Sequence, residues 1–254
     1  MDQAERCFFF EGEYGIFREL SAGVSAGFTT GTKRGRRPAA RLAHDLAAAL
    51  GAASSRIALT RQVHGRDVLV VDAAANPSRS GIVGTGDALI TREAGILLGI
   101  QSADCVPILL ADAAGPWIAA VHAGWRGTAA RILDALLGRL ELEGVPPSHL
   151  AVAFGPRISR DRYEVGPEVV TELSRAYGDL AVPFCALRPG REDRAWLDIA
   201  AFNRALLVRR GVPPERILDA ALCTASRADL FPSYRRDGKG AGRIVTGIVR
   251  RRAP

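Results

Sequence analysis

Three residues of the chain, His64, Cys105 and His122, carry side chains that can bind a metal ion or act as a nucleophile and its base. Each lies at or near the end of a short apolar segment of the kind that forms buried strands. Two imidazoles and a thiolate, with one coordination position left open, make the ligand set of a catalytic zinc site. A thiolate beside an imidazole is also the reactive pair of a cysteine hydrolase. The residue types alone leave both chemistries open.

The relation between Cys105 and His122 depends on the turn that separates them. The apolar segments VPILLAD and WIAAVHA flank residues 112–116, DAAGP, which must reverse the chain. If the turn is centred after Ala113, Cys105 lies directly opposite His122 on an antiparallel pair, with Cβ atoms about 4.5–5.5 Å apart. Because this is not a standard two-residue turn, a longer loop would change the register.

A glycine-containing segment, AGWRGT, follows His122 and leads into an amphipathic helix. The apolar residues of this helix, between 132 and 140, recur at helical spacing. Free N–H groups at the start of the helix, near Gly127 and Thr128 and beside the guanidinium of Arg126, predict an anion site. We therefore expect a metal ion or a thiolate next to a pocket for an anion the size of phosphate.

Other polar residues near these segments complete the candidate site. Arg61 and Gln62 lie just before the first histidine and are expected to touch the ligand. Asp104 immediately precedes the cysteine, where it either orients a ring or accepts a proton, or is only a hydrogen-bonded residue at a strand end. Arg235 and Arg236 lie in a polar segment, where they either reach the pocket or remain in a solvated loop.

Strands and helices that must position these residues follow one another along the whole chain. Strands are expected within residues 8–30, 56–72, 86–123, 150–154, 217–222 and 243–249, and helices within 38–50, from about 128 through 140, from 167 through 173, and within 198–210. Residues 31–38, 73–86, 179–196 and 229–242 are expected to be loops or irregular, and residues 250–254 a frayed basic tail. Because no linker or repeat interrupts the pattern, we expect residues 1–254 to form a single compact domain.

The composition limits the classes of function. Apolar residues make up 48% and charged residues 24%, as in soluble globular proteins, and no apolar run is long enough to span a membrane. The N-terminal segment lacks the features of a signal peptide, so the four scattered cysteines are expected to be free thiols in the cytoplasm.

The net charge is +7, and of the 34 basic residues all but Lys33 and Lys239 are arginine. This excess suits an anionic substrate, although a coding bias toward arginine explains it equally well. The arginines are dispersed and aromatic residues are only 6%, which argues against a nucleic-acid partner.

A series of motifs along the chain resembles one known family. The motifs are RQVHG, GDALIT, QSADCVPILLAD, VHAGWRGT, GPRI, YEVGPEV, LDIAAFNRALL, CT and FPSYRRDGKGAGR, in that order. They are similar to those of the laccase-domain family, once called multicopper polyphenol oxidases and now described as purine nucleoside phosphorylases. Some members are described as peptidoglycan editing factors. The resemblance covers residues 55–249, and the part from SADC to HAGWRG is the most specific.

The resemblance implies a fold, an activity and a cofactor. It implies an α/β (α+β) fold, a sandwich of mixed β-sheets with flanking helices, in which His64, Cys105 and His122 bind one zinc ion beside water or substrate. It also implies phosphorolysis of adenosine, inosine, guanosine and methylthioadenosine, with some adenosine deamination. The partners would be purine nucleosides and phosphate, with neither nucleic acid nor membrane. The oligomeric state stays open, with a monomer favoured.

The chain departs from the family pattern at two places. Residues 159–162, SRDR, follow Ile158 where the family often has a pair of cysteines, and residues 31–37, GTKRGRR, replace a glycine-rich stretch. These changes leave the implied zinc ligands intact, and they are expected to alter the rim of the pocket and with it the preferred nucleoside.

Two other classes of function remain open. One is a hydrolase or amidase that acts on peptidoglycan precursors, with Cys105 as nucleophile and His122 as base. The other is a binding module for a nucleotide or a wall precursor, without catalysis. A copper laccase is disfavoured because multicopper chemistry needs many histidines and the chain has four.

Overall fold

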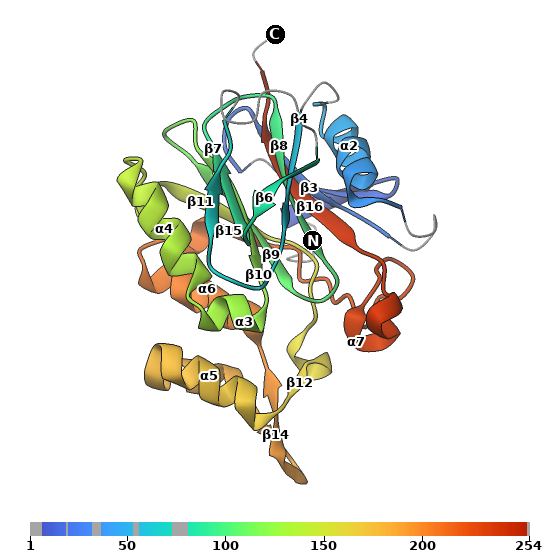
Figure 1. Ribbon diagram of the computed structural model, residues 1–254, viewed down its shortest axis with the longest axis vertical. Coiled ribbons are helices and arrows are strands. Elements are labelled where there is room, and N and C mark those ends of the chain that lie inside the picture. The colour runs from blue at the N-terminus through green and yellow to red at the C-terminus, as the bar shows by residue number, and fades with distance from the viewer. Residues whose placement is uncertain (1–6, 19, 32–36, 53–55, 73–80, 253–254) are drawn as a thin grey trace.

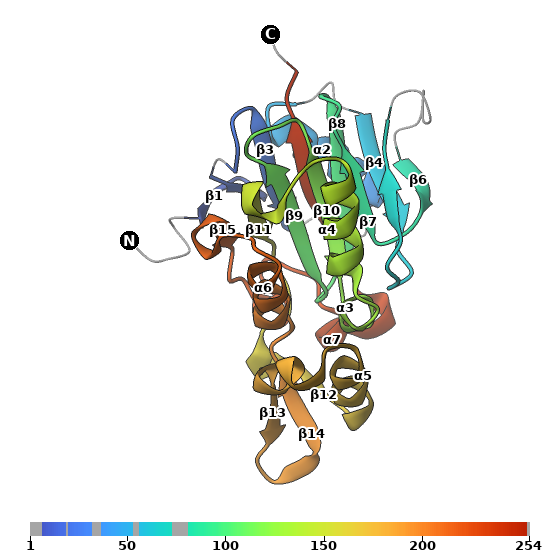
Figure 2. The ribbon, with the colours of Figure 1, turned by 90° about the vertical axis from the view of Figure 1, so that its left-hand side faces the viewer.

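Two mixed β-sheets pack face to face and form a sandwich, with helices on the outer faces (Figures 1 and 2). The structure, a computed structural model, describes residues 7–252 except 19, 32–36, 53–55 and 73–80. The expected sandwich of mixed sheets with flanking helices is confirmed. No helix in these described ranges is long and apolar enough to cross a membrane.

The first sheet is formed by seven strands of the described chain. Their order is β1 (Phe8–Glu11), β2 (Tyr14–Phe17), β3 (Val24–Thr29), β16 (Ile244–Arg250), β8 (Ile96–Ser102), β4 (Arg56–Arg61) and β6 (Gly81–Thr85). The pairs of β4 with β6 and β8 are parallel and the others are antiparallel. The C-terminal ends of β4 and β8 therefore lie at the same edge of this sheet.

The second sheet contains the strands next to Cys105 and His122. Its order is β15 (Ile217–Asp219), β11 (Leu150–Phe154), β9 (Val106–Asp112), β10 (Ile118–Ala123), β7 (Ala88–Thr91) and β5 (Val68–Val70). The central strands β9 and β10 are buried along their whole length. Side chains alternate between the two faces of a strand. On β9, Leu109 faces the first sheet while Ile108 and Leu110 face the helices, which explains the continuous apolar run.

Helices cover both outer faces of the sandwich. α2 (Ala39–Ala49) packs on the first sheet, whereas α4 (Ile132–Leu142) and α6 (Ile199–Arg209) pack on the second. The predicted inward face of α4 is confirmed, since Ile132, Leu133, Leu136, Leu137 and Leu140 are all buried. The remaining helices are α3 (Trp125–Ala129), α5 (Pro167–Tyr177) and α7 (Tyr234–Asp237), with 3₁₀ turns η1 (Pro147–His149), η2 (Arg160–Arg162), η3 (Gly178–Phe184), η4 (Pro214–Arg216) and η5 (Gly238–Gly240).

Some segments expected to be irregular are ordered. Residues 179–196 contain the strands β13 (Cys185–Arg188) and β14 (Arg191–Leu197), which form a small antiparallel sheet with β12 (Glu164–Val165). This hairpin projects from one end of the molecule, so its sequence lacks the apolar alternation of a buried strand (Figure 2). Residues 229–242 contain α7 and η5, and Arg250 belongs to β16 rather than to a tail. Residues 81–85, at the end of the segment expected to be a loop, form β6, which pairs in parallel with β4, so that part of the expectation is wrong. The basic residues 32–36 and residues 73–80 lie outside the described ranges.

The close packing between β2 and β3 leads to a prediction about stability. Gly15 lies opposite the fully buried Phe28, and a Cβ at this position would overlap the phenyl ring. We expect Gly15→Ala to lower the free energy of unfolding by about 1–3 kcal/mol, since the surrounding aromatic cluster must shift. Urea unfolding measures this change.

The matched control is Gly138→Ala in α4, where a Cβ would meet no atom within 4 Å. Alanine there should stabilise the helix by about 0.5–1 kcal/mol. Equal stability of wild type and Gly15→Ala would contradict the close packing of Phe28.

Candidate metal centre

His64, Cys105 and His122 converge at one end of the sandwich. Their ligand atoms all lie within 4.8 Å of one another. The sulfur of Cys105 is 3.9 Å from Nε2 of His64, and the two imidazole rings are 4.8 Å apart between centroids. His64 follows β4, Cys105 lies between β8 and β9, and His122 is in β10. The predicted convergence of the three side chains is confirmed, and they form a group that can hold a metal ion.

The hairpin of β9 and β10 has a different register from the predicted one. Ala111 pairs with Ile118 and Pro107 pairs with His122, so residues 113–117 form the connection. Cys105 therefore precedes the paired residues and is not directly opposite His122, and the prediction is wrong by two positions. A shift of two residues keeps side chains on the same face of a strand, which is why the sulfur still meets the imidazole.

The buried carboxylate of Asp87 joins the two histidine segments. It accepts a hydrogen bond from Nδ1 of His122 at 2.9 Å, and others from the N–H groups of Val63, His64 and Gly65 at 3.1, 3.0 and 2.8 Å. With Nδ1 engaged, Nε2 of His122 remains for a metal. His64 has a φ of 61°, a left-handed conformation that these backbone contacts stabilise.

Asp87 was not anticipated as a site residue. It lies in the motif GDALIT, immediately before the buried strand β7. Its sequence position resembles that of an ordinary residue at a strand start. A carboxylate is buried without penalty only when it has strong partners, and these partners come from distant parts of the chain.

The charges in the group favour the thiolate form of Cys105. Burial would raise the pKa of this thiol, but the hydrogen bonds and charges of His122 and His64 lower its pKa to about 6. Burial would likewise lower the pKa of His122, but Asp87 and the thiolate raise its pKa to about 9. The thiolate is the form of cysteine that binds metal ions.

The backbone around the group fits two imidazoles and a sulfur closely. A Cβ at Gly124, directly before α3, would lie 2.8 Å from the sulfur of Cys105 and 3.2 Å from Cδ2 of His64. A side chain at this position would displace both ligands. Glycine is therefore required for these three side chains to approach one another, and the resulting donor set suits a metal ion.

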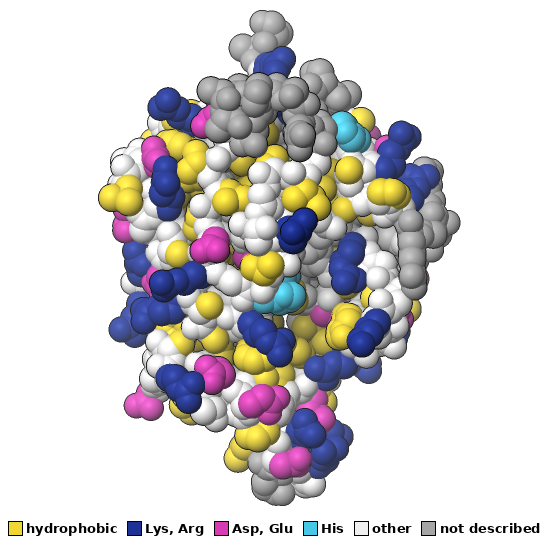
Figure 3. All heavy atoms as spheres, in the orientation of Figure 1, with side chains coloured by type: hydrophobic (Ala, Val, Ile, Leu, Met, Phe, Trp, Pro, Cys, Tyr) yellow, Lys and Arg dark blue, Asp and Glu magenta, His cyan; other side chains and the backbone are white. Residues whose placement is uncertain are grey.

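The three ligands lie in the wall of a cavity of about 770 Å³. Aromatic side chains and guanidinium groups line it, and Arg126 stacks over Trp125 while Arg235 stacks over Tyr163, at 4.3 and 5.4 Å from the ring centroids. Figure 3 shows basic side chains around a hollow with a histidine at its edge. A cavity of this size and lining suits a flat aromatic molecule together with an anion.

Most of the predicted binding residues line this cavity, but Gly127, Thr128 and Arg236 do not. Arg61, Gln62, Asp104, Arg126 and Arg235 line the cavity, together with Arg243, which was not anticipated. Gly127 and Thr128 are buried. The N–H of Thr128 donates to the carbonyl of Gly124 at 2.9 Å, so the expected free N–H at this position is wrong. The short α3 ends at Ala129, and α4 starts separately at Ile132.

Asp104, the neighbour of Cys105, binds the segment that carries Arg235. Its carboxylate accepts hydrogen bonds from the hydroxyls of Thr224 and Ser233 at 2.5 and 3.0 Å, and from the N–H of Arg235 at 2.6 Å. The ring-orienting role considered for Asp104 belongs to Asp87 instead. The alternative expectation, a hydrogen-bonded residue at a strand end, describes Asp104 better.

Gln62 and Arg236 are held by backbone groups. The amide of Gln62 donates to the carbonyl of Gln101 at 2.7 Å and accepts from its N–H at 2.9 Å, which joins the ends of β4 and β8. The guanidinium of Arg236 donates to backbone carbonyls, including that of Phe231 at 2.8 Å. Arg236 therefore holds the loop, and only its neighbour Arg235 reaches the cavity.

Comparison with known proteins gives consistent matches over most of the chain. The family model described as multi-copper polyphenol oxidoreductase laccase matches residues 6–251. A protein named adenosine deaminase RL5, from an unknown prokaryotic organism, is 36% identical over 207 residues, which cover 80% of this chain and 78% of that protein. A purine nucleoside phosphorylase of Deinococcus radiodurans is 38% identical over 207 residues, covering 80% and 75% of the two chains.

The solved structures share the same fold. The crystal structure of YlmD from Geobacillus stearothermophilus has a TM-score of 0.84 at 29% identity and covers 97% of this chain and 100% of that one. The crystal structure of the hypothetical protein YfiH from Bacillus licheniformis has a TM-score of 0.85 at 24% identity and covers 95% and 98%.

The contacts of Asp87 predict that this residue controls metal affinity. We expect Asp87→Asn to weaken metal binding by about 10–100-fold, because the ring of His122 loses the acceptor that orients it. The free energy of unfolding should fall by about 1–3 kcal/mol, since an amide cannot accept all of these hydrogen bonds. Competition with a chromogenic chelator measures the affinity.

Asp104→Asn is the matched control, because it removes a buried carboxylate with three donors, none of them on a histidine ring. It should cost similar stability and much less metal affinity. Equal losses of affinity in the two variants would show that Asp87 has no specific role.

Proposed function

The chain belongs to the multi-copper polyphenol oxidoreductase laccase family, and from this premise we propose that it is a zinc-dependent purine nucleoside phosphorylase. The observation that carries the proposal is the position of His64, Cys105 and His122 in the wall of an arginine-lined cavity. Relatives named purine nucleoside phosphorylase, at 37–38% identity, support it. Zinc is proposed because two imidazoles and a thiolate are typical zinc ligands.

Copper oxidase chemistry is not proposed, despite the descriptive name of the family. Such chemistry needs several copper ions with many histidine ligands. The other two histidines, His44 in α2 and His149 in η1, do not belong to the metal-binding group of the described residues.

The substrates are adenosine, inosine, guanosine and methylthioadenosine, each with inorganic phosphate. A phosphate oxygen attacks C1′ of the ribose, the bond from C1′ to the purine nitrogen breaks, and the purine takes up a proton. Positive charge develops on the ribose ring, so an anion held beside it stabilises the transition state. The products are the free purine and the pentose 1-phosphate.

Arg126 and Arg235 are proposed to hold the phosphate. Arg126 is four residues beyond His122, and the N–H of Arg235 is bound by the residue next to Cys105. The backbone of each arginine is thus held by a segment that carries a metal-binding residue, and the guanidinium of Arg235 also donates to the carbonyl of Glu164 at 2.8 Å. Guanidinium groups bind phosphate oxygens through paired, charge-assisted hydrogen bonds.

Trp125 and Tyr163 are proposed to hold the purine. Both line the cavity, and aromatic rings provide flat surfaces for a purine. Burial raises the pKa of Tyr163 well above its usual value, so its phenol stays protonated and can donate a hydrogen bond. These two rings and the arginines stacked on them would therefore orient the nucleoside next to the phosphate.

The residues around the metal group are proposed to hold a zinc ion and keep it accessible. His64, Cys105 and His122 would bind it, and Asp87 would fix the imidazole of His122. When bound, the ion supplies Lewis acidity in the cavity. A second activity, adenosine deamination, is favoured by the relative named adenosine deaminase RL5. In that reaction water replaces the amino group at C6 and ammonia leaves.

The two other classes of function fit the site less well. A hydrolase with Cys105 and His122 as its reactive pair would leave the nearby imidazole of His64 without a role. A binding module without catalysis would not need a metal-binding group in the wall of its cavity. All four cysteines are free thiols, which suits the proposed cytoplasmic location.

Metal content tests the proposed zinc site. Protein purified without chelators should contain about one equivalent of zinc, and Cys105→Ala should lose most of it because only two protein ligands remain. Elemental mass spectrometry measures the content. Cys223→Ala, which changes a free thiol outside the metal group, is the control and should keep its zinc. Full zinc content in Cys105→Ala would rule out this site.

Chromatography of nucleoside incubations tests the reaction. With adenosine or inosine and the zinc-loaded protein, free base should appear only when phosphate is present, since phosphate is the nucleophile. Inosine formed from adenosine would indicate deamination, and free base formed without phosphate would indicate hydrolysis instead. Unchanged nucleosides in every mixture would reject the purine assignment.

A further inference from the structure

Two arginines lie in the cavity on the side where the first sheet meets α2. Arg61 is the last residue of β4, and Arg243 directly precedes β16. Between these strands lies β8, which pairs with both. Its residue Gln101 lines the same cavity as the two arginines. The three side chains therefore come from three adjacent strands of the first sheet, at the same end of these strands.

These three side chains also lie on the same face of the first sheet. Side chains two residues apart on a strand share a face. On β4, β8 and β16 the residues Leu59, Leu97 and Val245 pack against α2. Arg61, Gln101 and Arg243 follow or precede these apolar residues by an even number of positions, so they too lie on the α2 face.

Neither Arg61 nor Arg243 forms an ion pair with a carboxylate among the described residues. Both are exposed, and the guanidinium of Arg243 donates only to the carbonyls of Ala241 and Gly242 in its own loop, at 3.0 and 2.9 Å. Asp104, which also lines the cavity, already accepts three hydrogen bonds and points its carboxylate at other groups. Two uncompensated positive charges therefore face the cavity here.

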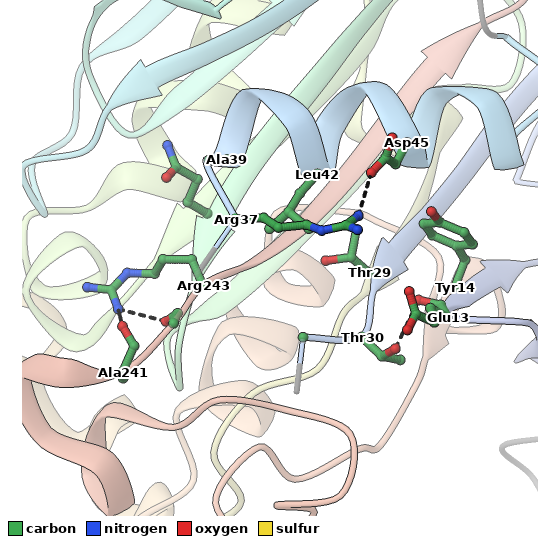
Figure 4. A pocket seen from close by; sticks show the side chains of 13 residues that line it. Glu13, Tyr14, Thr29, Thr30, Arg37, Ala39, Leu42, Asp45, Ala241 and Arg243 are labelled. Atoms are coloured by element: carbon green, nitrogen blue, oxygen red, sulfur yellow. Dashed lines mark hydrogen bonds and ion pairs between the residues drawn. The ribbon is translucent and has the colours of Figure 1, made fainter. Parts of the chain in front are cut away.

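A smaller cavity of about 210 Å³ continues beyond Gln101 and Arg243, which line both spaces. Figure 4 looks into it, with Arg243 at one end and Glu13 and Tyr14 at the other. Its inner charges are largely balanced, because Asp45 pairs with Arg37 at 3.0 Å. The positive charge is thus concentrated where the two cavities meet.

We propose that Arg61 and Arg243 form a second anion subsite, so that the cavity binds purine nucleosides that carry a phosphate ester, such as nucleoside 5′-monophosphates. The inference rests on the proposed function, in which Arg126 and Arg235 hold the phosphate that reacts. A single phosphate does not need four guanidinium groups. A second phosphate, on the sugar of the nucleoside, occupies the pair on the α2 side.

Calorimetry with the zinc-loaded protein tests this subsite at constant ionic strength. Adenosine 5′-monophosphate should bind about tenfold more tightly than adenosine, because it gains charge-assisted hydrogen bonds to two guanidinium groups. The double variant Arg61→Gln, Arg243→Gln should lose this preference. Its fold should be retained, since both residues are exposed. Equal affinity of the wild type for the two ligands would overturn the subsite.

Arg209→Gln is the matched control, since it removes an exposed arginine of α6 that does not line the cavity. It should keep the tenfold preference. A preference that survives in the double variant, or that disappears in Arg126→Gln alone, would place the ester elsewhere and overturn the assignment.

Competition with inorganic phosphate tests whether the phosphate ester and free phosphate occupy different subsites. Because the ester and the reacting phosphate are assigned to different subsites, saturating phosphate should leave the binding of adenosine 5′-monophosphate within about twofold. Direct competition between them would mean one shared anion subsite and would overturn the inference. A preference for the monophosphate in a protein that does not cleave nucleosides would reject the proposed phosphorolysis while retaining the subsite.

Discussion

The metal centre depends on one buried carboxylate. Asp87 holds the imidazole of His122 and, through three backbone N–H groups, the loop that carries His64. One side chain therefore fixes two of the three ligands relative to each other. Burying a charge of this kind is costly unless several donors surround it. The same donors that make its burial possible are the groups that the site must hold in place.

The sandwich explains why the ligands meet although they are far apart in sequence. The ends of β4 and β8 in the first sheet and of β10 in the second lie at the same end of the molecule. His64 follows a strand of the first sheet, Cys105 lies on the connection from the first sheet to the second, and His122 comes from the second. The apolar faces of the two sheets position these ends, because packing between Leu98, Ile100 and Leu109 sets how the sheets align. The site is thus built across the sandwich rather than within one motif.

The sequence was sufficient to predict the strands around the site, because apolar runs are local signals, and its resemblance to a known family singled out the three ligands, which their spacing alone did not. It was not sufficient for the register of β9 and β10, since the length of the turn decides it and the DAAGP segment fits more than one length. It also missed Asp87 and Arg243, whose importance arises only from neighbours distant in sequence. The β13–β14 hairpin was missed for a different reason, since a projecting strand lacks the apolar alternation that marks a buried one.

The two buried carboxylates of the site, Asp87 and Asp104, hold different groups in place. Asp87 fixes the histidines, whereas Asp104, next to Cys105, binds the N–H of Arg235 and the hydroxyls of two flanking loops. Asp104 has a φ of 92°, a conformation unfavourable for aspartate that its hydrogen bonds must stabilise. Cys105 and Arg235 are therefore linked through a single residue. A shift of the Cys105 sulfur would move this arginine with it, so the backbone at Asp104 sets the distance between the sulfur and the guanidinium that is proposed to bind phosphate.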